Sequence, residues 1–258
     1  MKLIYLLTGM FILTFTAILV SPSHAKIAPE SILGVWLFDD ITGGTMVKDS
    51  YETGKDGIIK GNPKLVEGKF GKALEFDGVS DFVDVPVNLN ECKEVTEVIW
   101  TYTHKLPPGE RYQIISNDIG SYGRDLQIRP ANYWIFHTEG QAITYAVVPT
   151  LNSWEHLAAT WSTKEVKFYI NGKLVATGAG DSAVYNDGVT VNIGRNMSQK
   201  DYYDGVLDEV ALFNAILTEE DIKNIADNGL GKSLGMAAVA YAGKLTTAWA
   251  NVKANIRF

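Results

Sequence analysis

The chain has 258 residues and a formal net charge of −7 at pH 7. An acidic protein is poorly suited to nucleic acid or anionic lipid, because both attract Lys and Arg side chains, so we expect neither as a partner. The single cysteine, Cys92, allows no internal disulfide, and a hydrophobic core must therefore stabilise the fold unaided. A β-sandwich of roughly 200 residues buries enough surface to do that as one domain.

The amino terminus has the pattern of a secretory signal peptide. Lys2 precedes an apolar run at residues 3–20, which ends in Pro22 and small residues before Lys26. A retained membrane anchor is the alternative, because the run is nearly as long as the roughly 20 residues that span a bilayer. The small residues favour cleavage. We therefore expect a signal peptide at residues 1–25, and a secreted, extracellular or periplasmic chain that does not insert into a membrane after cleavage.

Short strand-like runs separated by turn residues occupy most of the chain. The candidates, in order, are residues 33–38, 57–59, 73–76, 82–85, 95–104, 113–116, 125–129, 133–138, 143–148, 189–193 and 206–213. Clusters of Gly, Asp and Asn separate many of them, and these residues supply turn conformations. In residues 95–104 alternation places Trp100 and Tyr102 on one face, and Glu97 and Ile99 on the other.

Residues 154–176 give the clearest local prediction, a meander of three antiparallel strands. Strand-like residues 155–161 and 166–170 flank a short polar turn, and Asn171-Gly172 follows before a third run. Asn-Gly is the strongest short hairpin signal, because both residues accept the positive φ that a type I′ turn requires.

One helix is predicted before the carboxyl-terminal tail. Thr218 is a candidate N-cap, acidic residues follow it in the first turn, and Gly229 is a candidate stop. Many short strands with regular turn signals and a single helix indicate an all-β sandwich.

The order of several segments resembles a known family. The chain contains, in sequence, GVWLFDD, GKFGKALEFDG, WEHLAATWS, VKFYINGKLVATG, NIGR and YDGVLDEVALFNAILTEEDI. This combination, within about residues 32–226, is similar to the laminin-G-like jelly rolls of the concanavalin A-like lectin/glucanase superfamily. The resemblance implies an all-β, two-sheet antiparallel jelly-roll sandwich at residues 26–229, with one short helix on its C-terminal side. It does not fix the function, because this fold hosts lectins, adhesion modules, lyases and glycosidases.

Candidate catalytic groups are scarce. Retaining glycosidases need two carboxylates about 5 Å apart, and pairs such as Asp208 and Glu209 do not have that spacing on a predicted strand. The glucanase relatives use a Glu-x-Asp-x-Glu strand, which this sequence lacks. Lyase chemistry by a Tyr/His pair stays open, because both residue types are present. We assign no catalytic residue.

Asp208 is the strongest candidate metal ligand. It shares a predicted strand face with Val206 and Val210, where a carboxylate needs a partner. Related jelly rolls bind a structural calcium through an Asp on this late strand, so the resemblance implies calcium at Asp208, with Asp39 and Asp77 as lesser candidates. Calcium takes roughly six to eight oxygen ligands in flexible geometry. The alternative is that Asp208 accepts backbone N–H groups or pairs with an Arg, and that Asp77 only caps a turn.

Aromatic and polar residues provide the candidates for ligand binding. Sugars stack on aromatic rings while a few polar side chains hold their hydroxyl groups. The candidates are Tyr102, Arg124, Trp134, His137, Tyr202 and Tyr203. Tyr202 and Tyr203 follow a polar turn and are the better exposed candidates, whereas Trp100 and Trp134 are more readily explained as sandwich core.

The tail at residues 230–258 departs from the sandwich pattern. Leu245, Trp249, Val252 and Ile256 recur at helical spacing. An amphipathic helix packed on the sandwich, a sorting or partner-binding signal, and a loosely ordered terminus all remain open.

Our leading hypothesis is an exported, non-catalytic recognition module that binds carbohydrate or a surface glycoprotein. The alternatives are a polysaccharide-active enzyme of the same fold, either a glycosidase or a lyase, and a structural cell-surface adhesion domain. The sequence indicates neither which glycan is bound nor an oligomeric state.

Overall fold

The computed structural model describes residues 27–236, except residues 43, 110, 121–122, 130–132, 139–143, 146, 181–187 and 199–200. The predicted signal peptide and most of the tail, with Leu245 and Trp249, lie outside the described residues. Among the helices of the described part, none is long and apolar enough to cross a membrane.

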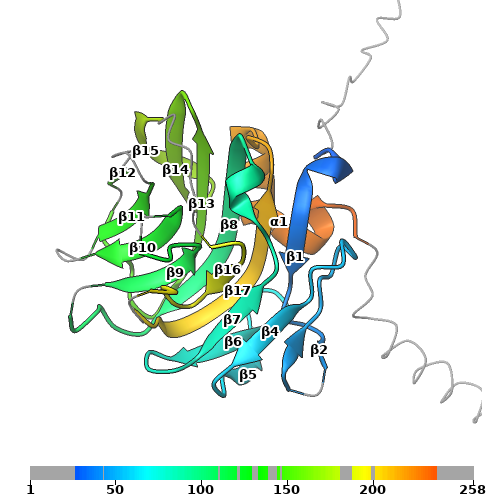
Figure 1. Ribbon diagram of the computed structural model, residues 1–258, viewed down its shortest axis with the longest axis vertical. Coiled ribbons are helices and arrows are strands. Elements are labelled where there is room, and N and C mark those ends of the chain that lie inside the picture. The colour runs from blue at the N-terminus through cyan, green and yellow to red at the C-terminus, as the bar shows by residue number, and fades with distance from the viewer. Residues whose placement is uncertain are drawn as a thin grey trace, which may run out of the picture.

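Two antiparallel sheets pack face to face as a sandwich (Figure 1). The first, sheet A, has eight strands in the order β15-β14-β13-β8-β17-β6-β5, and β1 also pairs with β17. Its strands are β1 (Ile32–Trp36), β5 (Lys64–Glu67), β6 (Lys72–Asp77), β8 (Glu94–Thr103), β13 (Trp154–Ser162), β14 (Glu165–Ile170), β15 (Lys173–Ala179) and β17 (Asp204–Phe213).

The second, sheet B, has nine strands in the order β12-β11-β10-β9-β16-β7-β4-β3-β2. Its strands are β2 (Ile41–Thr42), β3 (Met46–Val47), β4 (Gly57–Lys60), β7 (Phe82–Val85), β9 (Tyr112–Ser116), β10 (Asp125–Arg129), β11 (Tyr133–His137), β12 (Thr144–Tyr145) and β16 (Val191–Ile193). Two short 3₁₀ segments, η1 (Pro29–Ser31) and η2 (Leu89–Glu91), complete the connections. The prediction of an antiparallel all-β sandwich is confirmed.

Apolar side chains form two clusters, one on each side of sheet A. The larger cluster fills the space between the sheets and includes Trp36, Trp134 and Phe168. The smaller cluster joins the other face of sheet A to helix α1 (Glu219–Ser233) and includes Val98 and Ile225. Figure 1 shows α1 against β8 and β17, away from β9–β12. Sheet A is therefore apolar on both faces where α1 covers it.

Helix α1 begins as predicted, and the predicted stop at Gly229 interrupts it. The Thr218 side chain accepts a hydrogen bond from Asp221 N, and the Asp221 side chain accepts one from Thr218 N, so the two form a capping box. Gly229 has φ 78° and ψ 165°, a non-helical conformation that separates the first helical segment from a short second one ending at Ser233. The chain turns back into a helix because Leu230 N donates to Glu209 Oε2 at 2.8 Å and Leu230 is buried against sheet A.

The predicted meander is formed by β13, β14 and β15, which pair in antiparallel order. Asn171 has φ 51° and Gly172 has φ 73°, so both residues adopt the positive φ of a type I′ turn. A Cβ atom at Gly172 would lie 3.0 Å from Lys223 Cα. The turn therefore also sets how closely α1 approaches the sheet.

Candidate functional site

The outer face of sheet B, the face turned away from the core, carries polar side chains. Leu126 and Ile128 of β10 belong to the core between the sheets. Because successive side chains on a strand alternate between the two faces, Asp125 and Gln127 point to the outer face. Both are buried.

A row of polar residues crosses five neighbouring strands of this face. Pairing aligns, from β11 through β10, β9 and β16 to β7, the residues His137, Asp125, Ser116, Asn192 and Asp84. Asn192 Nδ2 donates to Asp84 Oδ1 at 2.8 Å. These residues form the polar row.

Arg195 extends the polar row toward β7. Its Nε donates to Asn192 Oδ1 at 2.8 Å, and its Cζ lies 3.6 Å from the centroid of the Phe82 ring. The guanidinium group is thus held between an amide and an aromatic face, which fixes its orientation.

Next to the row, Gln113 of β9 lies directly opposite Gln127 of β10. The pairing passes from Leu126–Ile115 to Gln127–Gln113, which leaves Ile114 as the extra residue of a β-bulge. Both glutamine side chains are 0 % exposed. The amide oxygen and nitrogen of each have no hydrogen-bond partner in the part of the chain that the structure describes. A buried polar group without a partner lowers the stability of the folded state by about 1–3 kcal/mol, so this pair destabilises the fold.

His137 lies at one end of the polar row as a neutral imidazole at pH 7. Its pKa is lowered to about 4, chiefly by burial and also by the positive charges of Arg129 and Arg111, while Asp118 opposes the shift. Arg111 is itself paired, with its Nε 3.0 Å from Asp201 Oδ2. The three charged neighbours place both signs of charge around this end of the row.

Two loops beside the polar row are hydrogen-bonded to other segments at the same edge. Asn196 Nδ2 donates to Asp118 Oδ2 at 2.9 Å, and Gly188 N donates to Asn117 O at 2.9 Å. Near these bonds Ile119 is 51 % exposed. The edge of the face thus combines fixed polar groups with an exposed apolar side chain.

The sequence-predicted ligand residues fall into different places. His137 lies in the polar row, and Tyr202 is half-buried beside it, with its ring 6.4 Å from the Phe82 ring. Tyr102 lies on sheet A, half-buried, with its ring 5.9 Å from that of His104. Only His137 and Tyr202 therefore lie at the outer face of sheet B.

The other predicted ligand residues lie in the core. Tyr203, expected to be exposed, is 0 % exposed, and that expectation is wrong. Its hydroxyl group lies 2.8 Å from Thr103 Oγ1, because it points inward when its neighbour Tyr202 points outward. Trp134 is buried and donates from Nε1 to Glu155 Oε2 at 3.2 Å.

Arg124 is also buried, although a surface role is predicted for it. Its Nη1 donates to Leu89 O at 2.6 Å, and its Cζ lies 4.1 Å from the Trp161 ring centroid. The pKa of Glu97 is raised well above its usual value by burial and by Asp125, and Arg124 opposes that rise. Arg124 thus supports η2 and the core from within.

Among the predicted metal ligands, Asp208 has the most unusual surroundings. It is 0 % exposed; Oδ2 accepts a hydrogen bond from Phe70 N at 3.0 Å, and Oδ1 has no partner among the described residues. The pKa of Asp208 is raised to about 8, chiefly by burial and also by the charges of Glu209 and Asp39, while the hydrogen bond from Phe70 N opposes the rise. Three carboxylates therefore influence one another at this point.

Asp77 lies apart from Asp208. It pairs in register with Asp204, whereas Leu207, the neighbour of Asp208, pairs with Leu74 at the other end of β6. Its Oδ1 accepts hydrogen bonds from Val79 N and Ser80 N, each at 2.8 Å, which is the turn-capping alternative. Across the described ranges, no group of three or more His, Cys, Asp or Glu side chains is arranged to hold a metal ion.

Comparison with known proteins identifies the family. A family model described as the concanavalin A-like lectin/glucanases superfamily matches residues 77–223, more than half of the chain. The chain belongs to this superfamily. No curated protein matches the sequence.

Solved structures similar to this superfamily member come from enzymes and from binding domains. Trypanosoma rangeli sialidase in complex with 2,3-difluoro-KDN has 16% identity and a TM-score of 0.62, over 80% of this chain and 33% of that one. The botulinum neurotoxin serotype C1 binding domain has 16% identity and a TM-score of 0.62, over 77% of this chain and 52% of that one. The binding domain of botulinum neurotoxin DC in complex with rat synaptotagmin II has 14% identity and a TM-score of 0.63, over 78% and 52%. The chain spans about a third of the sialidase and half of the toxin domains, and such identities show a shared fold alone.

Sequence reasoning missed the glutamine pair and most of the polar row. In Asp125–Arg129 the alternation of Leu126 and Ile128 with Asp125 and Gln127 was a usable signal for a polar outer face. In Tyr112–Ser116 the bulge hides the alternation, since all five residues are buried. The residues of the polar face can therefore be identified only once the pairing of the strands is known.

Proposed function

We propose that this protein is an exported recognition module that binds a neutral carbohydrate on the outer face of sheet B. The observation that carries the proposal is the opposed pair Gln113 and Gln127, buried and without hydrogen-bond partners in the described structure. Each amide offers a carbonyl acceptor and two N–H donors. A sugar hydroxyl both donates and accepts, so vicinal hydroxyl groups match two adjacent amides.

The charges around the polar row favour a neutral ligand. Both acidic and basic side chains lie there, namely Asp84, Asp118, Asp125, Asp201, Arg111, Arg129 and Arg195. An anionic polymer would meet these carboxylates, and a cationic ligand would meet the guanidinium groups. Lectins share this fold, and two similar structures are toxin binding domains, which supports recognition at the level of the fold.

The test is direct binding of the purified protein to a panel of neutral and charged glycans, followed by calorimetry on the best neutral one. Gln113→Ala with Gln127→Ala should weaken binding by about tenfold or more, because hydrogen bonds worth roughly 1 kcal/mol each are lost. Thr177→Ala, at an exposed position of β15 in the other sheet, is the matched control and should leave the affinity unchanged. Equal affinity in the double variant and the wild type would refute the proposal.

The same samples separate binding from turnover. Products released from the bound polysaccharide, measured as reducing ends or unsaturated sugars, should stay at the level of a protein-free control. If the product-releasing activity co-purifies with the protein and is lost in His137→Ala, the protein is an enzyme that acts at this face and not a recognition module.

We also propose that calcium stabilises the protein at Asp208. The supporting observation is Asp208 Oδ1, a fully buried carboxylate oxygen without a partner in the described residues, with Asp39 and Glu209 close enough to raise the Asp208 pKa. Oxygen donors of this kind suit calcium. Asp77, which caps its own turn, lies outside this proposal.

Calcium binding of this kind predicts a shift of the melting temperature. An ion that binds only the folded state adds about 2.7 kcal/mol when its free concentration is about a hundred times its dissociation constant. A chelator should therefore lower the melting temperature of the wild type, and Asp208→Ala should abolish the difference between chelated and calcium-loaded samples. Asp77→Ala is the control and should retain it. A wild-type melting curve that chelator does not move would refute the calcium site.

A further inference from the structure

The outer face of sheet A is only partly covered by helix α1. Val98 of β8 and Ala158 of β13 pack in the helix-side cluster and are paired with each other. Four residues farther along the same face, Tyr102 pairs with Trp154. Tyr102 and Trp154 are both half-buried, so the helix covers one end of this face and leaves aromatic rings at the other.

A strip of residues in register runs across this uncovered end. From β13 through β8, β17 and β6 to β5, pairing aligns Trp154, Tyr102, Val206, Glu75 and Lys64. Neighbouring strands lie about 4.8 Å apart, so the strip is roughly 19 Å wide. We call it the aromatic strip. Its two rings lie 5.5 Å apart between centroids at an interplanar angle of 61°.

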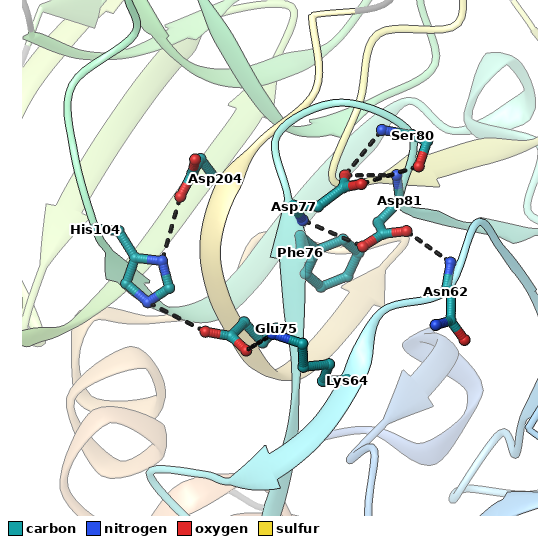
Figure 2. A pocket seen from close by; sticks show the side chains of 9 residues that line it. All are labelled: Asn62, Lys64, Glu75, Phe76, Asp77, Ser80, Asp81, His104 and Asp204. Carbon is teal, nitrogen blue, oxygen red and sulfur yellow. Dashed lines mark hydrogen bonds and ion pairs between the residues drawn. The ribbon is translucent and has the colours of Figure 1, made fainter.

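A pocket of about 340 Å³ adjoins the aromatic strip (Figure 2). Its lining residues are Asn62, Lys64, Glu75, Phe76, Asp77, Ser80, Asp81, His104 and Asp204. His104 joins the pocket to the strip, because its ring lies 5.9 Å from that of Tyr102. Figure 2 shows His104 between two carboxylates: Nδ1 is 3.2 Å from Asp204 Oδ1, and Nε2 is 3.8 Å from Glu75 Oε1.

The carboxylates of this pocket are already compensated. Asp81 accepts backbone N–H groups from Asn62 at 2.7 Å and from Asp77 at 3.2 Å. Glu75 and Asp204 pair with lysines, through Lys64 Nζ at 3.3 Å and Lys105 Nζ at 2.7 Å. The pocket therefore lacks the uncompensated negative charge that would select a cation, and its single lining lysine, paired with Glu75, offers no free positive charge to select an anion.

We infer that the aromatic strip and the adjoining pocket form a second saccharide-binding site, on the opposite side of the sandwich from the polar row. Tyr102 and Trp154 offer faces for the apolar C–H surface of a sugar ring, and His104 with its two carboxylates offers hydrogen-bonding groups for hydroxyls. Aromatic rings and a few convergent polar groups are the usual elements of a small-ligand site; here the rings belong to the strip and the polar groups line the adjoining pocket. A neutral saccharide is the ligand class that fits both parts.

Buried polar groups on the same face supply an independent observation. One row from the strip, between it and the helix-side cluster, Trp100 pairs with His156. Trp100 is 5 % exposed and His156 is 0 % exposed. The Trp100 Nε1 atom and both ring nitrogens of His156 have no hydrogen-bond partner within the described residues. Donors and acceptors with unmet capacity thus lie one row along the same face from Tyr102 and Trp154.

Two saccharide sites on opposite faces make a cross-linking protein. One molecule would hold two glycan chains, one along the polar row and one along the aromatic strip. The second site does not depend on the first, since no residue is shared between them, and either site functions if the other does not.

The test measures stoichiometry and cross-linking with a neutral oligosaccharide identified on the glycan panel and with its parent polysaccharide. Calorimetry of the wild type should give two sites per chain, and turbidity should report cross-linked polysaccharide. Trp154→Ala and, separately, His104→Gln should each remove one site and the turbidity, with an affinity loss of about tenfold at the strip. Lys173→Ala, at an exposed position of β15, is the control and should change neither.

The variants distinguish failure of this site from failure of the polar row. Gln113→Ala with Gln127→Ala should retain the strip site alone, and adding Trp154→Ala should remove all binding. Binding that survives in the glutamine variant and is lost with Trp154→Ala supports the strip even where the polar row contributes nothing. Unchanged stoichiometry in both Trp154→Ala and His104→Gln, with melting curves confirming that both variants fold, would overturn the second site. A wild type without any site, or with a single site that Trp154→Ala and His104→Gln leave intact, would overturn it equally.

Discussion

The outer faces of the two sheets carry different side chains: apolar residues on sheet A and polar residues on sheet B. On sheet A, the outward residues Val98 and Ala158 pack under helix α1 with Ile225. On sheet B, the outward residues Gln113 and Gln127 are buried without hydrogen-bond partners in the described structure. The first face adds a second apolar layer to the fold, and the second carries polar groups that cost stability. Such a cost is expected where a surface is kept for a ligand.

The largest effect should come from opening the apolar layer on sheet A. Ile225 is fully buried, and Ile225→Ala should lower the free energy of unfolding by about 2–5 kcal/mol, because it leaves a cavity between α1 and the sheet. Lys223→Ala, two residues away and exposed, should cost less than about 0.5 kcal/mol. Denaturant titrations measure both. Similar small losses in the two variants would mean that α1 adds little to the sandwich.

An acid-sensitive contribution should also belong to sheet A. Burial lowers the pKa of His156 to about 3, and Asp227 opposes this shift, whereas an unfolded histidine titrates near 6.5. Between these values the unfolded chain binds a proton that the folded chain does not. The His156 contribution is therefore constant above about pH 6.5 and falls by about 1.4 kcal/mol per pH unit as the pH drops below it. The measurement is the free energy of unfolding of the wild type and of His156→Phe at pH 6.5 and 4.5. Between these pH values the wild type should lose about 1.4 kcal/mol per pH unit more than the variant. Equal losses in the two proteins would contradict this prediction.

A smaller effect should follow from disturbing the turn that contacts α1. Gly172→Val should lower stability by more than about 1 kcal/mol, because a β-branched residue resists positive φ and its Cβ would crowd Lys223. Gly109→Val is the control, since nothing lies within 4 Å of a Cβ there. Equal melting temperatures for Gly172→Val and the wild type would show that the turn does not limit how α1 packs.

The smallest effect, opposite in sign, should come from the polar face. Replacing both Gln113 and Gln127 by Leu should raise stability by about 1 kcal/mol, because it removes buried amides without partners, and should abolish glycan binding. The reverse change on sheet A, Val98→Thr, should lower stability. Thermal melts measure the stability of both variants. A double variant less stable than the wild type would mean that the two amides make hydrogen bonds in the folded protein.

Local signals in the sequence predicted those parts of the fold that depend on local chemistry. Asn171-Gly172 determines its turn through positive φ, and Thr218 with Asp221 caps the helix through bonds three residues apart. The strands β2, β3 and β5 were missed: two have only two residues each, and β5 (Lys64–Glu67) is exposed along most of its length. A strand with no buried face leaves no alternation to read.

The candidate site was less predictable, because it depends on which strands meet. His137 was chosen from the sequence for its residue type, but its neighbours Asp125 and Ser116 follow from pairing between β9, β10 and β11. Tyr202 and Tyr203 are adjacent in sequence, and only the structure decides that Tyr203 points into the core. Residue type identifies a candidate side chain, whereas the face that it occupies is fixed by register.

The pairing of β1 with β17 determines how the domain would respond to mechanical load. Ile32 at the start of β1 pairs with Phe213 at the end of β17, and Ile27 and Leu234, near the two ends of the described chain, share the helix-side cluster. Tension applied through these ends would therefore unzip β1 from β17 one hydrogen bond at a time and peel α1 from sheet A. The strands β9, β10 and β16 lie in the other sheet, outside this line of force. A pulled domain would yield first on its helix side, while the strands that carry the polar row stayed paired.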